Sequence, residues 1–143
     1  MRTVRQLLEA KAPEIFAVSP DVPVIEAIRL MGQKHIGAVL VMEGGRLAGI
    51  LSERDYARKI VLEGRSSKDT PVRDIMTAKV ITIGLDDSVQ GCMQVVTRDR
   101  IRHLPVVDAA GNVLGVVSIG DLVKAVIEDQ QLELDQLQRY IAS

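Results

Sequence analysis

Two segments of the sequence place a serine three residues before an aspartate, where a strand pattern turns into a helix pattern. They read GILSERDYARKI at 49–60 and GVVSIGDLVKAV at 115–126. A helix N-terminus presents backbone N–H groups that have no partner inside the helix, so it attracts anions. A serine hydroxyl at this point can bind phosphate, and a carboxylate can accept hydrogen bonds from both hydroxyls of a ribose. These four candidates for nucleotide binding are Ser52, Asp55, Ser118 and Asp121.

The same four residues also have a purely structural interpretation. A serine at the N-cap followed by an acidic residue three positions on is close to a capping box, which stabilises a helix start by about 1 kcal/mol. That interpretation does not explain why Gly49 and Gly115 stand at matched positions before the two serines. From the residues alone, both roles stay open.

The elements around these motifs form an internal repeat that covers nearly the whole chain. Three pairs of segments match: 3–8 with 71–76, 16–31 with 81–96, and 34–55 with 100–121. The second pair is offset by 65 positions and the third by 66, so we place the gain or loss of one residue between the first helix and the next strand of the unit.

Each repeat is predicted to fold as a β-α-β-β-α unit, which makes the chain a member of the α/β (α+β) class. Apolar residues recur at helical spacing, and glycine-containing turns separate short apolar runs. The expected helices are 22–33 and 87–98, and the expected strands are 15–18, 38–42, 47–51, 80–83, 104–107 and 113–117. The predicted division is a first unit at 1–62, a linker at 63–71, a second unit at 72–128 and a C-terminal helix extension at 129–143.

The composition argues against several kinds of partner. The net charge of the 143 residues is −1, which gives no electrostatic attraction to nucleic acid or to anionic membranes. No apolar run approaches the roughly 20 residues of a membrane span, and the chain start lacks the apolar region of a signal peptide. A single cysteine, Cys92, allows no internal disulfide and suits a reducing compartment. We therefore expect a cytoplasmic protein, with Cys92 packed in a core.

The repeated motifs resemble a known family. GILSERD and GVVSIGD, with VRDIMTAKVITI between them and RHLPVVDAAGNVLG before the second, are similar to a pair of cystathionine-β-synthase (CBS) domains, also called a Bateman module. The resemblance covers about residues 3–128. It implies two units related by a pseudo-twofold axis, with adenine nucleotides bound in clefts between them, in a free-standing CBS-pair protein.

The resemblance also implies roles for individual residues. The aspartate of each motif corresponds to a ribose ligand, and Thr82 to a threonine that faces the nucleotide, although a strand threonine also suits a sheet without any ligand. Ala17 stands at the equivalent position of the first unit. The residues that the resemblance places near phosphate are Arg102 and His103 in the second unit, where a solvated basic loop is the alternative. Their equivalents in the first unit, Ile36 and Gly37, carry no charge, so Lys34 and His35 just before them are the candidates to supply it. Arg54 is expected to pair either with phosphate or, in solvent, with Glu53 or Asp55.

The resulting hypothesis is a regulatory protein that binds AMP, ADP, ATP or NAD(H) without a metal, and that senses energy or redox state. It would signal to an unidentified regulated protein through a conformational change. One alternative is a structural homodimer whose clefts stay empty. Another is an enzyme such as a nucleotide hydrolase, but the sequence contains no phosphate-binding P-loop and no evident nucleophile with its base.

A homodimer is expected whether the clefts bind a nucleotide or stay empty. The helices after Asp55 and Asp121 are predicted to present apolar side chains, and an apolar stripe continues to the chain end, where it needs a partner. The side chains expected on this surface are Ile60, Val61, Val123, Ile127, Leu132, Leu134 and Leu137.

Overall fold

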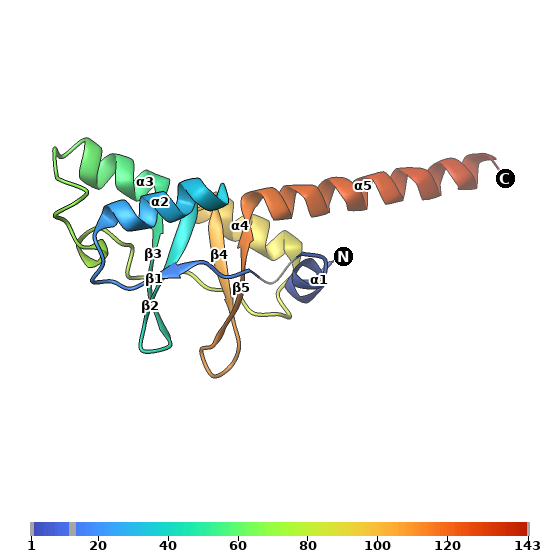
Figure 1. Ribbon diagram of the computed structural model, residues 1–143. Coiled ribbons are helices and arrows are strands. Elements are labelled where there is room, and N and C mark those ends of the chain that lie inside the picture. Colours follow the sequence, from blue (N-terminus) through green and yellow to red (C-terminus); the bar gives the residue numbers. More distant parts are fainter. Residues whose placement is uncertain (1, 12–13, 143) are drawn as a thin grey trace. The chain divides into compact units, whose positions relative to one another are not determined.

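The chain divides into two units, each built from segments that are separated in the sequence. The structure is a computed structural model that describes residues 2–11 and 14–142. The terminal unit contains residues 2–11, 82–108 and 114–142, and the central unit contains residues 14–81 and 109–113. Both combine a small sheet with helices, as the sequence predicts for an α/β protein (Figure 1).

The central unit is built on a three-stranded sheet in the order β1-β2-β3. Strand β1 runs parallel to β2, and β2 runs antiparallel to β3 through the turn at Gly44 and Gly45, whose φ angles of 59° and 78° suit glycine. Its elements are β1 (Ala17–Val18), α2 (Val24–Lys34), β2 (Ala38–Glu43), β3 (Arg46–Ser52), α3 (Glu53–Tyr56), a π-helical turn at Ala57–Val61 and a 3-10 turn at Val72–Asp74.

The core of the central unit lies between α2 and the sheet. It consists of Val24, Ala27, Met31, Val39, Val41, Leu51, Ile60, Val72 and Ile75. The surface position predicted for Ile60 is wrong, because its side chain is only 3% exposed. The π-helical turn, in which Leu62 N–H donates to the Ala57 carbonyl at 3.0 Å, shifts the helical phase. Ile60 therefore faces the core, while Val61 and Leu62 stay exposed.

The terminal unit contains a two-stranded sheet and three helices. Its elements are α1 (Val4–Glu9), α4 (Val89–Asp99), β4 (His103–Val107), β5 (Val113–Ser118) and α5 (Ile119–Ala142). Its core consists of Val4, Leu7, Ile83, Val89, Cys92, Val96, Leu104, Val106, Val117, Leu122 and Ala125, so the predicted packing of Cys92 is confirmed. The strand predicted at 80–83 is reduced to a single parallel bridge between Ile83 and Val106.

The opening segment of each repeat packs in the unit formed by the rest of the other repeat. Val4 N–H donates to the Asp87 carbonyl at 2.9 Å, so α1 joins the start of α4. In the central unit, Val72 N–H donates to the Val22 carbonyl at the same distance, just before α2. Both opening segments bury apolar side chains in these positions. The two sequence repeats therefore exchange their first segments.

The two matched glycines are explained by this exchange. A Cβ added to Gly49 would lie 2.8 Å from Met76 Sδ and 2.9 Å from the Thr77 carbonyl oxygen. A Cβ added to Gly115 would lie 2.9 Å from a methyl group of Leu8. Each glycine thus admits the close approach of an opening segment, which is a packing role.

The position of the extra residue between the repeats differs from the prediction. Val18 pairs with Val41 and Ile83 pairs with Val106, so the offset of 65 persists into β2 and β4. The offset between the repeats is 66 at Gly49 and Gly115, and Gly115 lies beyond the turn between β4 and β5. The extra residue therefore lies after Val106, in the hairpin, where a longer turn costs little.

We predict that Gly49→Ala lowers the free energy of unfolding by about 1–3 kcal/mol, because the new methyl group meets a backbone carbonyl that cannot move alone. Gly115→Ala should cost less, since the Leu8 side chain can rotate away. Urea unfolding followed by circular dichroism measures both changes. Gly32→Ala is the control: it lies in α2 with nothing within 4 Å of the added Cβ, and should not destabilise. A Gly49→Ala protein as stable as wild type would contradict the packing role.

Candidate functional site

In the central unit, the first motif forms the start of α3. Ser52 is the last residue of β3 and the N-cap of the helix. Its Oγ accepts a hydrogen bond from the Asp55 backbone N–H at 3.2 Å, and Asp55 Oδ2 accepts from the Ser52 backbone N–H at 3.0 Å. These reciprocal bonds are a complete capping box, so the structural role expected of these residues is present.

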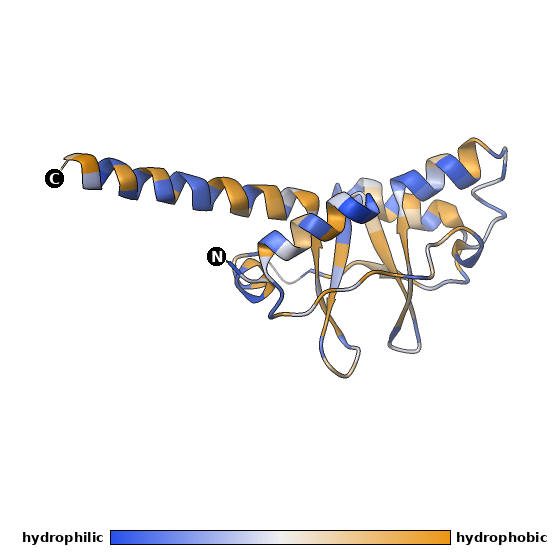
Figure 2. Ribbon diagram, turned by 180° about the vertical axis from the view of Figure 1, so that it is seen from behind, coloured by the Kyte–Doolittle hydropathy of each residue, from blue (hydrophilic) through white to orange (hydrophobic). Residues whose placement is uncertain are grey.

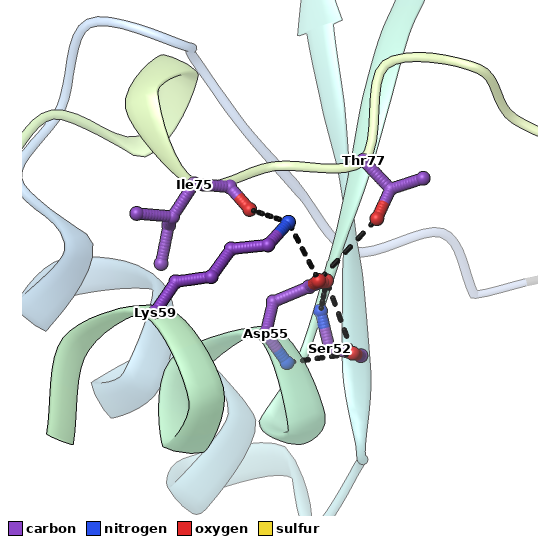
Figure 3. Close-up of polar contacts among 5 residues, drawn as sticks. All are labelled: Ser52, Asp55, Lys59, Ile75 and Thr77. Atoms are coloured by element: carbon purple, nitrogen blue, oxygen red, sulfur yellow. Dashed lines mark hydrogen bonds and ion pairs between the residues drawn. The ribbon is translucent and has the colours of Figure 1, made fainter. Parts of the chain in front are cut away.

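The Asp55 carboxylate has further partners from outside the cap (Figure 3). Its Oδ1 lies 3.2 Å from Lys59 Nζ and accepts a hydrogen bond from the Thr77 hydroxyl at 3.3 Å. Lys59 Nζ also donates to the Ile75 carbonyl at 2.9 Å. One carboxylate thus joins the helix start to the exchanged opening segment.

In the terminal unit, the second motif repeats this arrangement at the start of α5. Asp121 Oδ2 accepts from the Ser118 backbone N–H at 2.8 Å, and Ser118 Oγ accepts from the Asp121 backbone N–H at 3.1 Å. The ammonium group that contacts this carboxylate comes from a different place. Lys11 Nζ, two residues beyond α1, lies 2.8 Å from Asp121 Oδ2 and 2.9 Å from the Val116 carbonyl oxygen.

The contacts of Asp121 favour its ionised form. Partial burial by itself raises the pKa of this carboxyl, but the hydrogen bond and charge of Lys11 and the hydrogen bonds to Ser118 outweigh it. The pKa of Asp121 is therefore held below its ordinary value. An anionic carboxylate has only acceptors, which suits hydrogen bonds donated by hydroxyl groups.

Other predicted residues of the terminal unit lie at the same edge of its sheet. The parallel bridge of Ile83 to β4 puts Thr82, which is exposed, toward the N-terminal end of that strand. His103 begins β4, and the Arg102 carbonyl accepts from the Ile119 N–H at 2.8 Å, at the start of α5. Because β5 ends beside the beginning of β4, the structure brings Arg102, His103, Ser118 and Asp121 to one end of these strands. Thr82 lies on the neighbouring segment, beside β4.

The corresponding edge of the central unit carries less charge. The Gly37 carbonyl accepts from the Glu53 N–H at 3.0 Å, in the place that Arg102 takes in the terminal unit. Arg102 therefore corresponds to Gly37, and the predicted match of Arg102 with Ile36 is wrong by one residue. The reason is that the two repeats are still offset by 65 positions at this point of the chain. Ala17 is exposed on β1, and Arg54 is exposed in the first turn of α3.

The remaining predicted residues of the central unit are engaged in local structure. Lys34 Nζ lies 5.4 Å from the centre of the Phe16 ring, a cation–π distance. His35 ends α2 in a left-handed conformation with φ 55°, and Ile36 packs against the core. These contacts place the three residues next to β2 and leave their expected role near phosphate as a prediction.

Three residues at the two carboxylates were missed by the sequence analysis. Lys59 stands four residues after Asp55, so helical spacing alone was a usable signal for it. Lys11 and Thr77 reach their carboxylates from the exchanged segments, and no local pattern signals such a contact.

No three histidine, cysteine, aspartate or glutamate side chains among the described residues gather closely enough to hold a metal ion. No helix in the described part of the chain has both the length and the apolar character needed to cross a bilayer.

Comparison with known proteins matches this chain to one family. The CBS domain model matches residues 4–62 and 72–128. A mitochondrial CBS domain-containing protein of Arabidopsis thaliana is 47% identical over 126 residues, which cover 85% of this chain and 61% of that protein. The chain thus spans somewhat less than two thirds of this relative.

Solved structures show the same relationship. A protein of Burkholderia ambifaria, described as a signal-transduction protein with CBS domains, has a TM-score of 0.87 and 52% identity, over 90% of this chain and 96% of that one. A CBS domain pair solved in complex with 5-methylthioadenosine and S-adenosyl-L-methionine has a TM-score of 0.78 at 24% identity, over 90% of this chain and 98% of that one, and shares the fold. Both the sequence match and the fold give the same answer: the chain belongs to the CBS domain family and contains two CBS domains.

Proposed function

We propose that this CBS domain pair is a regulatory module that binds an adenine nucleotide at Asp55 and Asp121 and passes the signal to a partner protein by changing conformation. The observation that carries the proposal is the repeated site. In each unit, a carboxylate at the start of a helix is held by a capping box and contacted by a lysine ammonium. Capping alone does not require the lysine.

The chemistry of a ribose fits this carboxylate. Two vicinal hydroxyl groups can donate hydrogen bonds to the two oxygens of one carboxylate, and bonds to a charged acceptor are the stronger kind. The ligands bound to the structural relative, 5-methylthioadenosine and S-adenosyl-L-methionine, both contain a ribose joined to adenine. This shared part of the ligands supports an adenosine compound as the ligand class.

The two sites are expected to differ in their preference for phosphate. The terminal unit has Thr82, Arg102 and His103 at the sheet edge, where the central unit has Ala17, Gly37 and Ala38. A guanidinium beside a helix N-terminus attracts phosphate, whereas a glycine gives only its backbone. We therefore expect AMP, ADP, ATP or NAD(H) to bind more tightly in the terminal unit than in the central unit.

A regulatory role needs no catalysis. Ligand binding shifts a protein between two conformations only by its difference in affinity for them, typically 1–3 kcal/mol. Sensing energy through AMP and ATP, or redox state through NAD(H), would use this coupling without any metal. The cytoplasmic location and the existence of a regulated partner stay predictions from the sequence.

We also propose that the protein is a homodimer, with α5 in the contact. Beyond Ala125, none of the described residues of α5 is buried. Apolar residues nevertheless recur along this part of the helix (Figure 2). Its exposed apolar residues are Ile127, Leu132, Leu134, Leu137, Tyr140 and Ile141. Ile127, Leu134 and Ile141 repeat every seven residues, the spacing at which helices pair side by side. A second copy of this chain offers the same stripe.

The nucleotide proposal predicts that Asp121→Ala and Asp55→Ala each remove one class of site. The loss of charge-assisted hydrogen bonds should weaken AMP binding at the altered site by about 1.5–3 kcal/mol, with the tighter class lost in Asp121→Ala. Isothermal titration calorimetry measures the affinity and stoichiometry. Asp69→Ala, in an exposed loop position, is the matched control and should bind as wild type.

The structural alternative makes the opposite prediction for the same experiment. If the chain is only a dimerisation module with empty clefts, AMP, ADP, ATP and NAD(H) will all fail to bind or to raise the melting temperature. Wild-type affinity and stoichiometry in both aspartate variants would also contradict the proposed sites. Melting curves without ligand show whether loss of the cap, worth about 0.5–2 kcal/mol, has unfolded either variant.

The dimer proposal predicts that light scattering finds two copies, and that truncation after Glu128 raises the dissociation constant while both units stay folded. Burying one leucine is worth roughly 1.5–3 kcal/mol, so Leu137→Glu should weaken the dimer in the full chain. Gln136→Glu adds the same charge one position away and is the matched control. A full chain that stays monomeric at tens of micromolar would refute the proposal.

A further inference from the structure

The two binding carboxylates obtain their ammonium groups from different parts of the chain. At Asp55, Lys59 stands four residues later on the same helical segment. Four residues after Asp121 stands Ala125, which is only 1% exposed and lies in the core. The terminal unit therefore has no lysine at that place, and Lys11 takes over the contact from the segment that follows α1.

The Lys11 contact engages the oxygen that a ligand would need. Its Nζ lies 2.8 Å from Asp121 Oδ2, the same atom that accepts the Ser118 N–H in the cap. The ammonium also bonds the Val116 carbonyl on β5, so two partners hold it in place. Ribose hydroxyls that approach this carboxylate meet an oxygen that already accepts two hydrogen bonds.

We propose that Lys11 is an intramolecular competitor for Asp121, which an adenosine ligand must displace from the carboxylate. This inference rests on the proposed function, in which Asp121 binds the ribose. Displacement frees Lys11 and so loosens the end of α1, which packs against β5 through Leu8. At Asp55 the lysine belongs to the same helical segment as the aspartate and only bonds the Ile75 carbonyl of the second opening segment, so there the opening segment does not supply the competing ammonium group. Occupancy of the terminal unit is thereby coupled to the N-terminal helix.

The strength of the competition is modest. Both side chains of the pair are partly exposed, at 38% for Lys11 and 29% for Asp121, so water and salt weaken it. An ion pair of this kind changes an equilibrium by about two- to fivefold. That is enough to lower the affinity of the site for adenosine without preventing adenosine from binding.

The test uses adenosine, which has the ribose but no phosphate, so that removal of a positive charge does not alter phosphate attraction. The full chain with Asp55→Ala leaves one site, and calorimetry compares it with and without Lys11→Met. We expect Lys11→Met to bind adenosine about two- to fivefold more tightly, with a difference that shrinks as ionic strength rises. Lys11→Arg keeps the charge and should bind like the parent. Lys79→Met, at the matching place in the second opening segment, is the control and should change nothing.

The outcomes separate this inference from the proposed function. Adenosine binding that is unchanged or weakened by Lys11→Met overturns the competition while the nucleotide site stands. Weaker AMP binding with unchanged adenosine binding also overturns it, because Lys11 would then serve the phosphate. If neither adenosine nor AMP binds to wild type, the proposed function fails and the inference fails with it.

Discussion

The start of one helix in each unit depends on a single carboxylate that must satisfy several donors at once. Asp55 and Asp121 complete the capping boxes that let a half-buried strand turn directly into a helix. The same carboxylates also hold a lysine, and through it a backbone carbonyl of the exchanged segment or of the strand. Because these carboxylate oxygens already accept hydrogen bonds inside the protein, a ligand that used the same oxygens would have to compete with those bonds.

Duplication has kept the cap and changed its surroundings. The serine, the aspartate and the glycine three residues before the serine recur in both CBS domains. The charged neighbours differ: Arg102 takes the place of Gly37, and the ammonium comes from a separate segment in the terminal unit. Under the proposed function, this difference in electrostatics lets the two sites respond to different concentrations of one ligand, or to two ligands.

The sequence predicted those features that depend on residues close together in the chain. The capping boxes, the amphipathic helices and the Gly44-Gly45 hairpin all follow from spacings of a few residues. Features that depend on distant segments could not be predicted. Nothing local shows that Val4 and Val72 pack in each other's repeats, because both units offer the same apolar pattern and the same hydrogen bonds.

Two predictions were wrong for a related physical reason: in each, the assumed position along a strand or around a helix was shifted by one residue. The alignment of the repeats slid by one residue because short apolar strands match almost equally well in two registers. Ile60 was placed on the surface because a regular α-helix was assumed, whereas the π-helical turn rotates the later side chains. The apolar spacing and the turns supplied the order of the elements, but not these local phases.

The exchanged segments impose an order on folding during synthesis. The core of the central unit is complete once Ile75 has left the ribosome, so this unit can fold while the chain is still growing. The core of the terminal unit needs Val4 and Leu7, made first, together with Leu122 and Ala125, made more than a hundred residues later. Helix α1 must therefore wait for nearly the whole chain with its apolar side uncovered. In the growing polypeptide, the apolar side chains of α1 have no core to join until the later residues of the terminal unit have been made.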